Sequence, residues 1–212
     1  MEELKPHRVF ICYHHENDQY YKEQLVRKAE VEKLFIDWSV GDGEIPDDWS
    51  DGKIRKFIRD NYLKDSRVTI VLVGSETRGR KHIDWEIRSS MYDGKVNRKS
   101  GIIAILLPGC ESKFVHVPDE ADDRYYRRRI NLCKEGAKSK SFYKSIYPSM
   151  PDRIVENLAA RNSLITIVNW SDLSDGKLAY LIEHCFKNAN RNKYVLSTLM
   201  RKKNSPRCLI YG

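Results

Sequence analysis

Short apolar segments alternate with amphipathic segments along most of the chain. Residues 8–13 (RVFICY), 67–75 (RVTIVLVGS) and 101–109 (GIIAILLPG) are rich in β-branched and aromatic residues and too short for an ordinary helix. Such runs are typical of strands that are buried on both faces of a sheet. Residues 34–40 (LFIDWSV) and 163–173 (SLITIVNWSDL) have the same character, so the sequence predicts five strands.

Helical patterns fill the segments between these strands. Asp18 is placed to cap a helix after the first strand, and Ser50 or Asp51 can cap a helix that runs to about Leu63. Three more helices are predicted at about residues 82–92, from residue 152, and at 175–188, the last with an apolar stripe of Leu178, Leu181, Ile182 and Cys185. This alternation indicates a doubly wound α/β fold, a parallel sheet with helices on both faces.

Two segments depart from this rhythm. Residues 110–163 are charged and rich in tyrosine, with no long hydrophobic period. We predict that they form an insertion packed outside the five-stranded sheet. The chain then consists of one domain over residues 1–190, followed by a basic C-terminal extension over 191–212.

The composition, with 41% hydrophobic and 32% charged residues, is that of an ordinary folded protein. No apolar run approaches the roughly 20 residues that a membrane-spanning helix needs, and the N-terminus lacks the apolar core of a secretion signal. Five cysteines without a CxxC pair indicate reduced thiols and a cytoplasmic location. Cys12 lies within an apolar strand pattern and is predicted to act as a small hydrophobic residue.

The net charge of +8 is concentrated at the C-terminus. Six basic residues and no acidic residue follow position 190, namely Arg191, Lys193, Arg201, Lys202, Lys203 and Arg207. Because the rest of the chain is nearly balanced, a dedicated nucleic-acid-binding face is not expected. We predict that residues 201–203 are flexible or contact a partner protein.

Parallel α/β sheets bind ligands beyond the carboxyl ends of their strands, where the loops converge. Here Tyr13 and His14 follow the first strand, and Asp37 and Trp38 belong to the end of the second. Ser75 opens the loop after the third strand. Aromatic, imidazole and carboxylate groups gathered at one edge of the sheet predict a nucleotide site.

The loop after the third strand, GSETRGRK (74–81), resembles a Walker phosphate loop in its glycine spacing. Arg80 and Lys81 stand where that motif needs a lysine and a hydroxyl residue, so the metal-binding hydroxyl is missing. Arg78, Arg80 and Lys81 can still attract phosphates beside the N-terminus of the next helix. The alternative is a solvated basic loop.

Glu86 is the strongest candidate for a functional side chain. On its predicted helix it lies beside the core-facing positions Ile83 and Ile87. Partial burial would raise the pKa of the carboxyl and strengthen its action on a developing cation. The alternative is an exposed helix carboxylate paired with Arg88 or Lys81.

His14 and His15 are adjacent at the end of the first strand, but no third ligand at a metal spacing accompanies them. We therefore predict no metal site. The histidine pair takes part in chemistry or simply caps the loop.

Four segments, taken in order, resemble TIR domains. RVFICYHHEND (8–18) is similar to their first strand and loop, and FIDWSVGDGEI (35–45) to the second strand and its lid-like loop. SRVTIVLVGSET (66–77) resembles the third strand, and HIDWEI (82–87) resembles the helix that carries the catalytic glutamate. The resemblance covers residues 8–109 and is nearest to the TIR-like proteins of the Thoeris antiphage system, of the ThsB type.

This resemblance implies a flavodoxin-like fold and an enzyme that consumes NAD+ as its substrate without a further cofactor. Glu86 corresponds to the catalytic carboxylate. The substrate-binding candidates are Tyr13, His14, Asp37, Trp38, Ser75, Arg78 and His82. Many TIR domains carry Trp and Cys four and three residues before the glutamate, whereas this chain has His82 and Ile83, so its nicotinamide pocket is expected to be built differently.

The resemblance also implies a signalling role. Thoeris TIR proteins sense phage infection and convert NAD+ into a cyclic ADP-ribose isomer or a related ADP-ribose signal that activates a separate effector. Self-association and a phage-derived trigger are implied as well, and the linkage of the product is left open. One carboxylate suits this chemistry because it can stabilise the oxocarbenium-like ribose. Two alternatives remain, a non-catalytic adaptor that acts by assembly and a nucleoside deoxyribosyltransferase-like enzyme.

Overall fold

The computed structural model describes residues 6–41, 44, 46, 48–118, 139–160 and 163–205. Five parallel strands form one sheet in the order β2-β1-β3-β4-β5. The strands are β1 His7–Cys12, β2 Phe35–Asp37, β3 Val68–Val73, β4 Gly101–Leu106 and β5 Ile165–Asn169. This strand order is that of flavodoxin-like proteins, so the predicted doubly wound sheet is confirmed.

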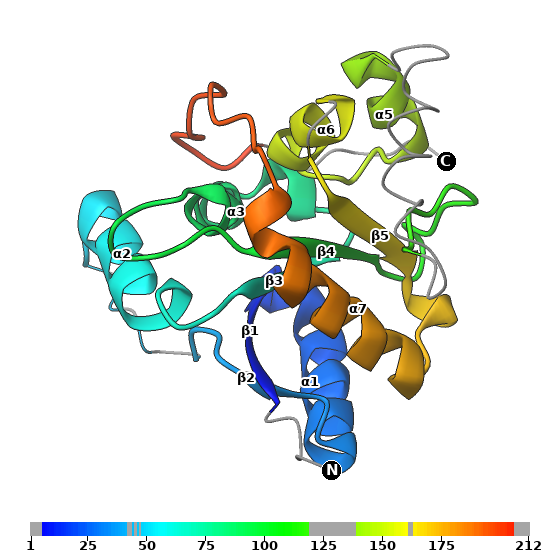
Figure 1. Cartoon of the computed structure of the whole chain (residues 1–212). Helices are drawn as coiled ribbons and strands as arrows, with labels where there is room; N and C mark the ends of the chain where they lie inside the picture. Colours follow the sequence, from blue (N-terminus) through cyan, green and yellow to red (C-terminus); the bar gives the residue numbers. More distant parts are fainter. Residues whose placement is uncertain are drawn as a thin grey trace.

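Helices cover both faces of the sheet (Figure 1). On one face lie α1 His15–Glu32 and α7 Asp175–Asn188. On the other lie α2 Asp51–Ile58, α3 Lys81–Met91, α5 Lys140–Ile146 and α6 Asp152–Ala159. A π-helical turn, Arg59–Leu63, continues α2, and short 3-10 turns occur at Thr77–Gly79, Trp170–Asp172 and Ala189–Arg191.

The strand side chains alternate between two apolar layers. Phe10 and Cys12 of β1 point to the face that carries α3, whereas Val9 and Ile11 point to the face that carries α1 and α7. Every residue of β3 is buried, as expected for a central strand covered on both sides. The predicted stripe of α7 is also confirmed, since its four apolar residues are buried.

The start of α1 differs from the prediction. His14 rather than Asp18 is the N-cap, because its backbone is extended and its Nδ1 accepts a hydrogen bond from the Asn17 N–H at 3.2 Å. Asp18 lies within the first turn, where its carboxyl accepts a hydrogen bond from the Thr77 hydroxyl at 3.3 Å. Burial raises the pKa of Asp18. Asp18 therefore links α1 to the loop after β3.

The described residues 139–160 of the predicted insertion do not lie outside the sheet. They contain α5 and α6, which belong to the connection from β4 to β5 and supply buried residues to the core, namely Tyr143, Tyr147, Met150, Ile154, Val155 and Leu158. α6 is the helix predicted from residue 152, whereas α5 is only about two turns long and too short to show a clear hydrophobic period in the sequence. Residues 119–138 of the predicted insertion lie outside the described residues.

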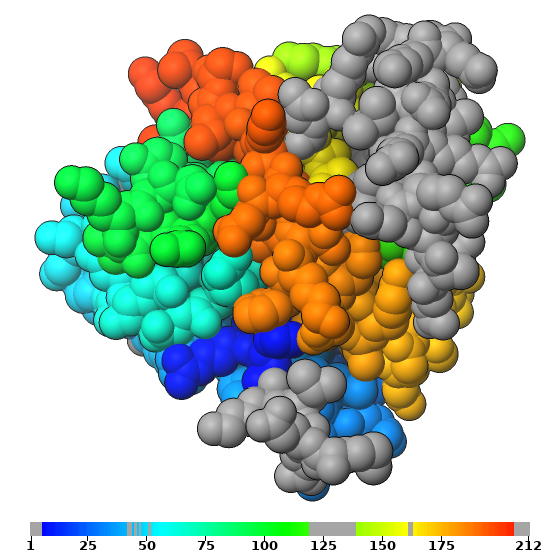
Figure 2. Space-filling model, in the orientation of Figure 1, coloured from blue at the N-terminus to red at the C-terminus, as the bar shows by residue number. Residues whose placement is uncertain are grey.

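The C-terminal extension packs on the domain as far as Ser205. Tyr194 and Leu196 contact the core on the α3 face, and the Tyr194 hydroxyl donates a hydrogen bond to the Ser100 carbonyl at 2.8 Å. In Figure 2 the orange-red C-terminal residues lie beside the green residues that follow α3. The prediction of a flexible or partner-bound tail is wrong at Arg201, whose backbone and side chain both bind this domain.

Gly101 begins β4 where α7 crosses the sheet. A Cβ atom at Gly101 would lie 2.5 Å from the carbonyl oxygen and 2.9 Å from the Cβ of Cys185 in α7. Because that backbone cannot yield without moving α7, we expect Gly101→Ala to lower the free energy of unfolding by about 1–3 kcal/mol in chemical denaturation. Gly176→Ala is the control, since nothing lies within 4 Å of an added Cβ there. Equal stability of the two variants would contradict the close approach.

Candidate functional site

A cleft of about 590 Å³ opens at the carboxyl end of β1. Its walls come from the loop after β1, the segment before α2, α2 itself and the start of α3. Its apolar wall is formed by Val40, Pro46, Trp49, Ile54 and Ile58. The cleft lies at the edge of the sheet where the sequence predicted a ligand site.

Glu86 lines this cleft and is half-buried. The helix directs Ile83 and Ile87 into the core and leaves the Glu86 carboxyl in the cleft, close to the end of β1. Burial raises the pKa of Glu86 to about 8, and a hydrogen bond with the Cys12 thiol offsets this only in part. Of the two alternatives that the sequence left open for Glu86, the structure shows the partly buried carboxyl, and its catalytic role stays a prediction.

Cys12 is a site residue that the sequence analysis missed. It is fully buried at the end of β1, and its thiol shares a hydrogen bond with the Glu86 carboxyl. Burial, followed by the Glu86 charge, raises the pKa of Cys12, so the thiol keeps its proton and acts as the donor. Its place at the carboxyl end of a strand was the available signal, but its apolar neighbours suggested packing alone.

Tyr13 and His14 continue β1 into the cleft. The Tyr13 ring is buried and stacks on His15 with ring centroids 4.3 Å apart. The Nδ1 atom of His14 accepts the Asn17 N–H, so in the neutral ring Nε2 carries the proton. Burial and, to a lesser degree, the Arg80 charge lower the pKa of His14, which favours this neutral form.

Arg80 and Lys81 provide positive charge at the rim of the cleft. Arg80 forms an ion pair with Glu76, whose carboxylate lies 3.8 Å from His14 Nε2. The Lys81 ammonium lies 4.8 Å from the centre of the Trp85 ring. Cations on a concave surface attract anionic groups, so this rim suits a phosphate.

Of the other candidates near this loop, His82 lines the cleft and Ser75 and Arg78 do not. The Arg78 guanidinium donates hydrogen bonds to the Pro148 carbonyl at 3.1 Å and to the Asp152 carboxylate at 3.0 Å. Ser75 is exposed after the end of β3. Arg78 therefore holds the start of α6, whereas Arg80 and Lys81 face the cleft.

Asp37 and Trp38 lie at the edge of the sheet and do not line the cleft. The Asp37 carboxylate pairs with the Lys22 ammonium at 2.8 Å and accepts a hydrogen bond from the Ser39 N–H at 3.1 Å. The Arg8 guanidinium lies 4.1 Å from the centre of the Trp38 ring. These contacts stabilise the end of β2, which stops at Asp37 instead of continuing to residue 40.

Over the described ranges, no three His, Cys, Asp or Glu side chains are grouped so that they could hold a metal ion. Within the same ranges, no helix has both the length and the apolar character needed to cross a membrane.

The cleft brings together two kinds of chemistry. Glu86 supplies a carboxyl group whose ionised form is disfavoured until a positive charge comes close. Arg80 and Lys81 supply positive charge at the rim. Such a cleft suits a ligand that carries a cationic ring at one end and phosphate groups beyond it.

Comparison with known proteins supports a family assignment. Residues 10–112 match the family model described as Thoeris protein ThsB, TIR-like domain. No curated protein matches the chain. Among solved structures, the chain is similar to the TIR domains in the structure of the activated Roq1 resistosome directly recognizing the pathogen effector XopQ. The sequence identity is 11% and the TM-score is 0.39. The match covers 86% of this chain and 98% of that chain. The family match extends from β1 to the segment after β4 and includes α3 with Glu86, so residues 10–112 are a TIR-like domain of the ThsB type.

Proposed function

We propose that this chain is an antiphage defence protein that cleaves NAD+ and releases a cyclic ADP-ribose-type or related ADP-ribose messenger. The observation that carries the proposal is the Glu86 carboxyl, half-buried in the cleft of a TIR-like domain with its pKa raised to about 8. A carboxyl in an environment of this kind is tuned for interaction with a cation. NAD+ presents such a cation in its nicotinamide ring.

The reaction breaks the bond between nicotinamide and ribose, and the bonding electron pair leaves with nicotinamide as a neutral ring. Positive charge then develops on the ribose, as in other glycoside-cleaving reactions. The cationic ring lowers the pKa of Glu86 as it enters, which favours the carboxylate. That carboxylate stabilises the ribosyl cation in a cleft where protein groups replace much of the water.

Other residues of the cleft orient the substrate. Arg80 and Lys81 attract the diphosphate at the rim. Trp49 offers aromatic surface to a ring of the substrate, and Tyr13 lines the same cleft. If a nucleophilic atom of the same ADP-ribose is held near the ribosyl cation, its high effective molarity lets it outcompete water, and a cyclic product forms.

The released messenger acts on a separate effector protein. In this proposal the chain works in the cytoplasm, self-associates through its TIR-like domain and responds to a phage-derived trigger. NAD+ is its substrate, and no further cofactor takes part.

We expect kcat/KM for NAD+ to rise with pH and to level off only above about pH 8, because only ionised Glu86 stabilises the cation. The direction follows from the raised pKa: well below it, the ionised fraction grows about tenfold for each unit of pH. NAD+ loss and the ADP-ribose products are followed by chromatography and mass spectrometry, with and without extract from phage-infected cells.

A kcat/KM that is constant from about pH 6 to about pH 9 would contradict the role of Glu86 ionisation. Absence of NAD+ loss under every activating condition would overturn the proposed activity and favour a non-catalytic adaptor.

A further inference from the structure

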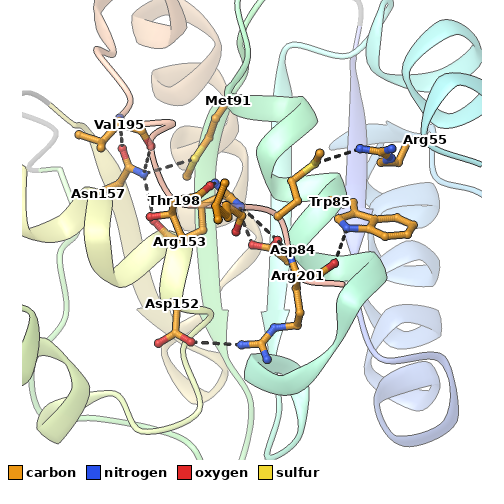
Figure 3. Close-up of polar contacts among 12 residues, drawn as sticks. Arg55, Asp84, Trp85, Met91, Asp152, Arg153, Asn157, Val195, Thr198 and Arg201 are labelled. Atoms are coloured by element: carbon orange, nitrogen blue, oxygen red, sulfur yellow. Dashed lines mark hydrogen bonds and ion pairs between the residues drawn. The ribbon is translucent and has the colours of Figure 1, made fainter. Parts of the chain in front are cut away.

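The C-terminal segment 194–205 runs along α3, the helix that carries the candidate catalytic carboxyl. The Arg201 N–H donates a hydrogen bond to the Asp84 carboxylate at 2.9 Å, and the Trp85 indole donates one to the Arg201 carbonyl at 2.9 Å (Figure 3). The Arg201 guanidinium donates to the Asp152 carboxylate at 3.2 Å. The segment is therefore fixed to both α3 and α6.

Further along, the same segment reaches the cleft. The Asn204 Oδ1 accepts a hydrogen bond from the backbone N–H of Lys81 at 2.8 Å, and the Ser205 N–H donates to the Gly79 carbonyl at 2.9 Å. Lys81 is the first residue of α3, and Arg80 before it provides no side-chain cap. Asn204 thus caps a helix that lies more than a hundred positions earlier in the sequence, and it also lines the cleft.

The hydrogen bond to Lys81 uses only one end of the Asn204 amide. It holds Oδ1 in place and so restricts the orientation of Nδ2, which carries two hydrogen-bond donors. The side chain is exposed, and it lines the cleft together with Arg80 and Lys81. Two cations and an amide donor on one cleft form a group that can bind phosphate oxygens.

We propose that Asn204 contacts the substrate, with Nδ2 donating a hydrogen bond to a phosphate oxygen of NAD+ while Oδ1 caps α3. This inference rests on the proposed NAD+ function and adds the C-terminal segment to the substrate site. Asn204 is then a binding residue for the diphosphate, and Arg201 is a positioning residue that holds the segment in place.

Asn204→Asp separates these two contributions. An aspartate keeps an oxygen that can accept the Lys81 N–H and is favourable at a helix N-terminus, so the melting temperature is expected to stay the same or rise. The substitution removes both Nδ2 donors and brings a negative charge towards the diphosphate. We expect NAD+ to bind about tenfold or more weakly, since a hydrogen bond to a charged group is lost.

Binding is measured by titration calorimetry of NAD+ into the Glu86→Gln protein, in which turnover is slowed, with and without Asn204→Asp. KM and kcat of the otherwise native protein are measured in parallel, and we expect the loss to fall on KM. Lys203→Ala is the matched control, because it removes an exposed neighbouring side chain that does not line the cleft.

Weaker binding with an unchanged melting temperature, together with normal binding by Lys203→Ala, supports the inference. If the native protein consumes NAD+ and Asn204→Asp leaves both binding and KM unchanged, Asn204 is only a cap and the inference is wrong. If the native protein neither binds nor consumes NAD+, the proposed function itself fails and the inference fails with it.

Discussion

Glu86→Gln is expected to reduce NAD+ cleavage at least about 100-fold, because it removes the charge that stabilises the ribosyl cation while keeping the size of the side chain. The rate is measured as NAD+ loss and as messenger formation, under the condition that activates the native protein. Glu86 lines the cleft on α3, whose buried face holds the helix in position, so the substitution should leave the fold intact.

Thermal melting of Glu86→Gln provides the control. The pKa of Glu86 is raised from 4.5 to about 8, so the folded protein binds this proton more tightly than the unfolded chain does. The stabilisation is complete below pH 4.5 and is lost as the pH rises through 8. We therefore compare the melting temperature of the Gln variant with that of the native protein at each pH. The difference, variant minus native, is expected to be larger at about pH 8 than at low pH. A Gln variant that melts normally and forms product at the native rate would show that Glu86 is an ordinary helix carboxylate.

Arg153→Met is expected to lower the free energy of unfolding by about 3–5 kcal/mol, the usual result of breaking a buried ion pair. The Arg153 side chain is fully buried and donates two hydrogen bonds to the Asp84 carboxylate, at 2.9 and 3.1 Å. It also donates to the Thr198 carbonyl at 3.2 Å (Figure 3). Methionine fills much of the space but leaves the carboxylate and the carbonyl without these donors. Urea denaturation at neutral pH measures the change.

Arg78→Met is the matched control for this prediction. Arg78 also pairs with a carboxylate, that of Asp152 at 3.0 Å, but both side chains are 34% exposed. An exposed pair contributes little, so the loss should stay within about 1 kcal/mol. If Arg153→Met is no more destabilising than Arg78→Met, the buried ion pair does not hold α3, α6 and the C-terminal segment together.

Much of the sheet could be predicted from local pattern. β3 and β4 are continuous apolar runs because strands in the middle of a parallel sheet are buried on both faces. The apolar stripe of α7 and the Ser50 cap of α2 follow from equally local rules. Glu86 could be singled out because its position beside a buried helix face places it at the boundary between core and solvent.

The assignment of polar side chains within the candidate site required the tertiary structure. Arg78 and Arg80 are two residues apart in one basic loop, yet Arg78 binds α6 while Arg80 lines the cleft. Asp37 was predicted to line the pocket, but its carboxylate pairs with Lys22 of α1 at the sheet edge. Residue type and spacing predict that a side chain is polar and near a strand end, but they do not identify the group it meets.

The C-terminal segment shows the same limit over a longer distance. Its basic composition suggested a free tail, and the sequence contains no periodic pattern there because the segment forms neither a helix nor a strand of the sheet. Its place depends on single hydrogen bonds between groups far apart in the chain, such as Asn204 with Lys81 and Arg201 with Asp84.

Hydrophobic periodicity records which face of an element is buried, so the sequence alone determined the sheet and the helix that carries Glu86. Pairings between distant polar groups leave no periodic trace, so only the tertiary structure decided that Cys12 bonds to Glu86 of that helix and that Asn204 lines the cleft.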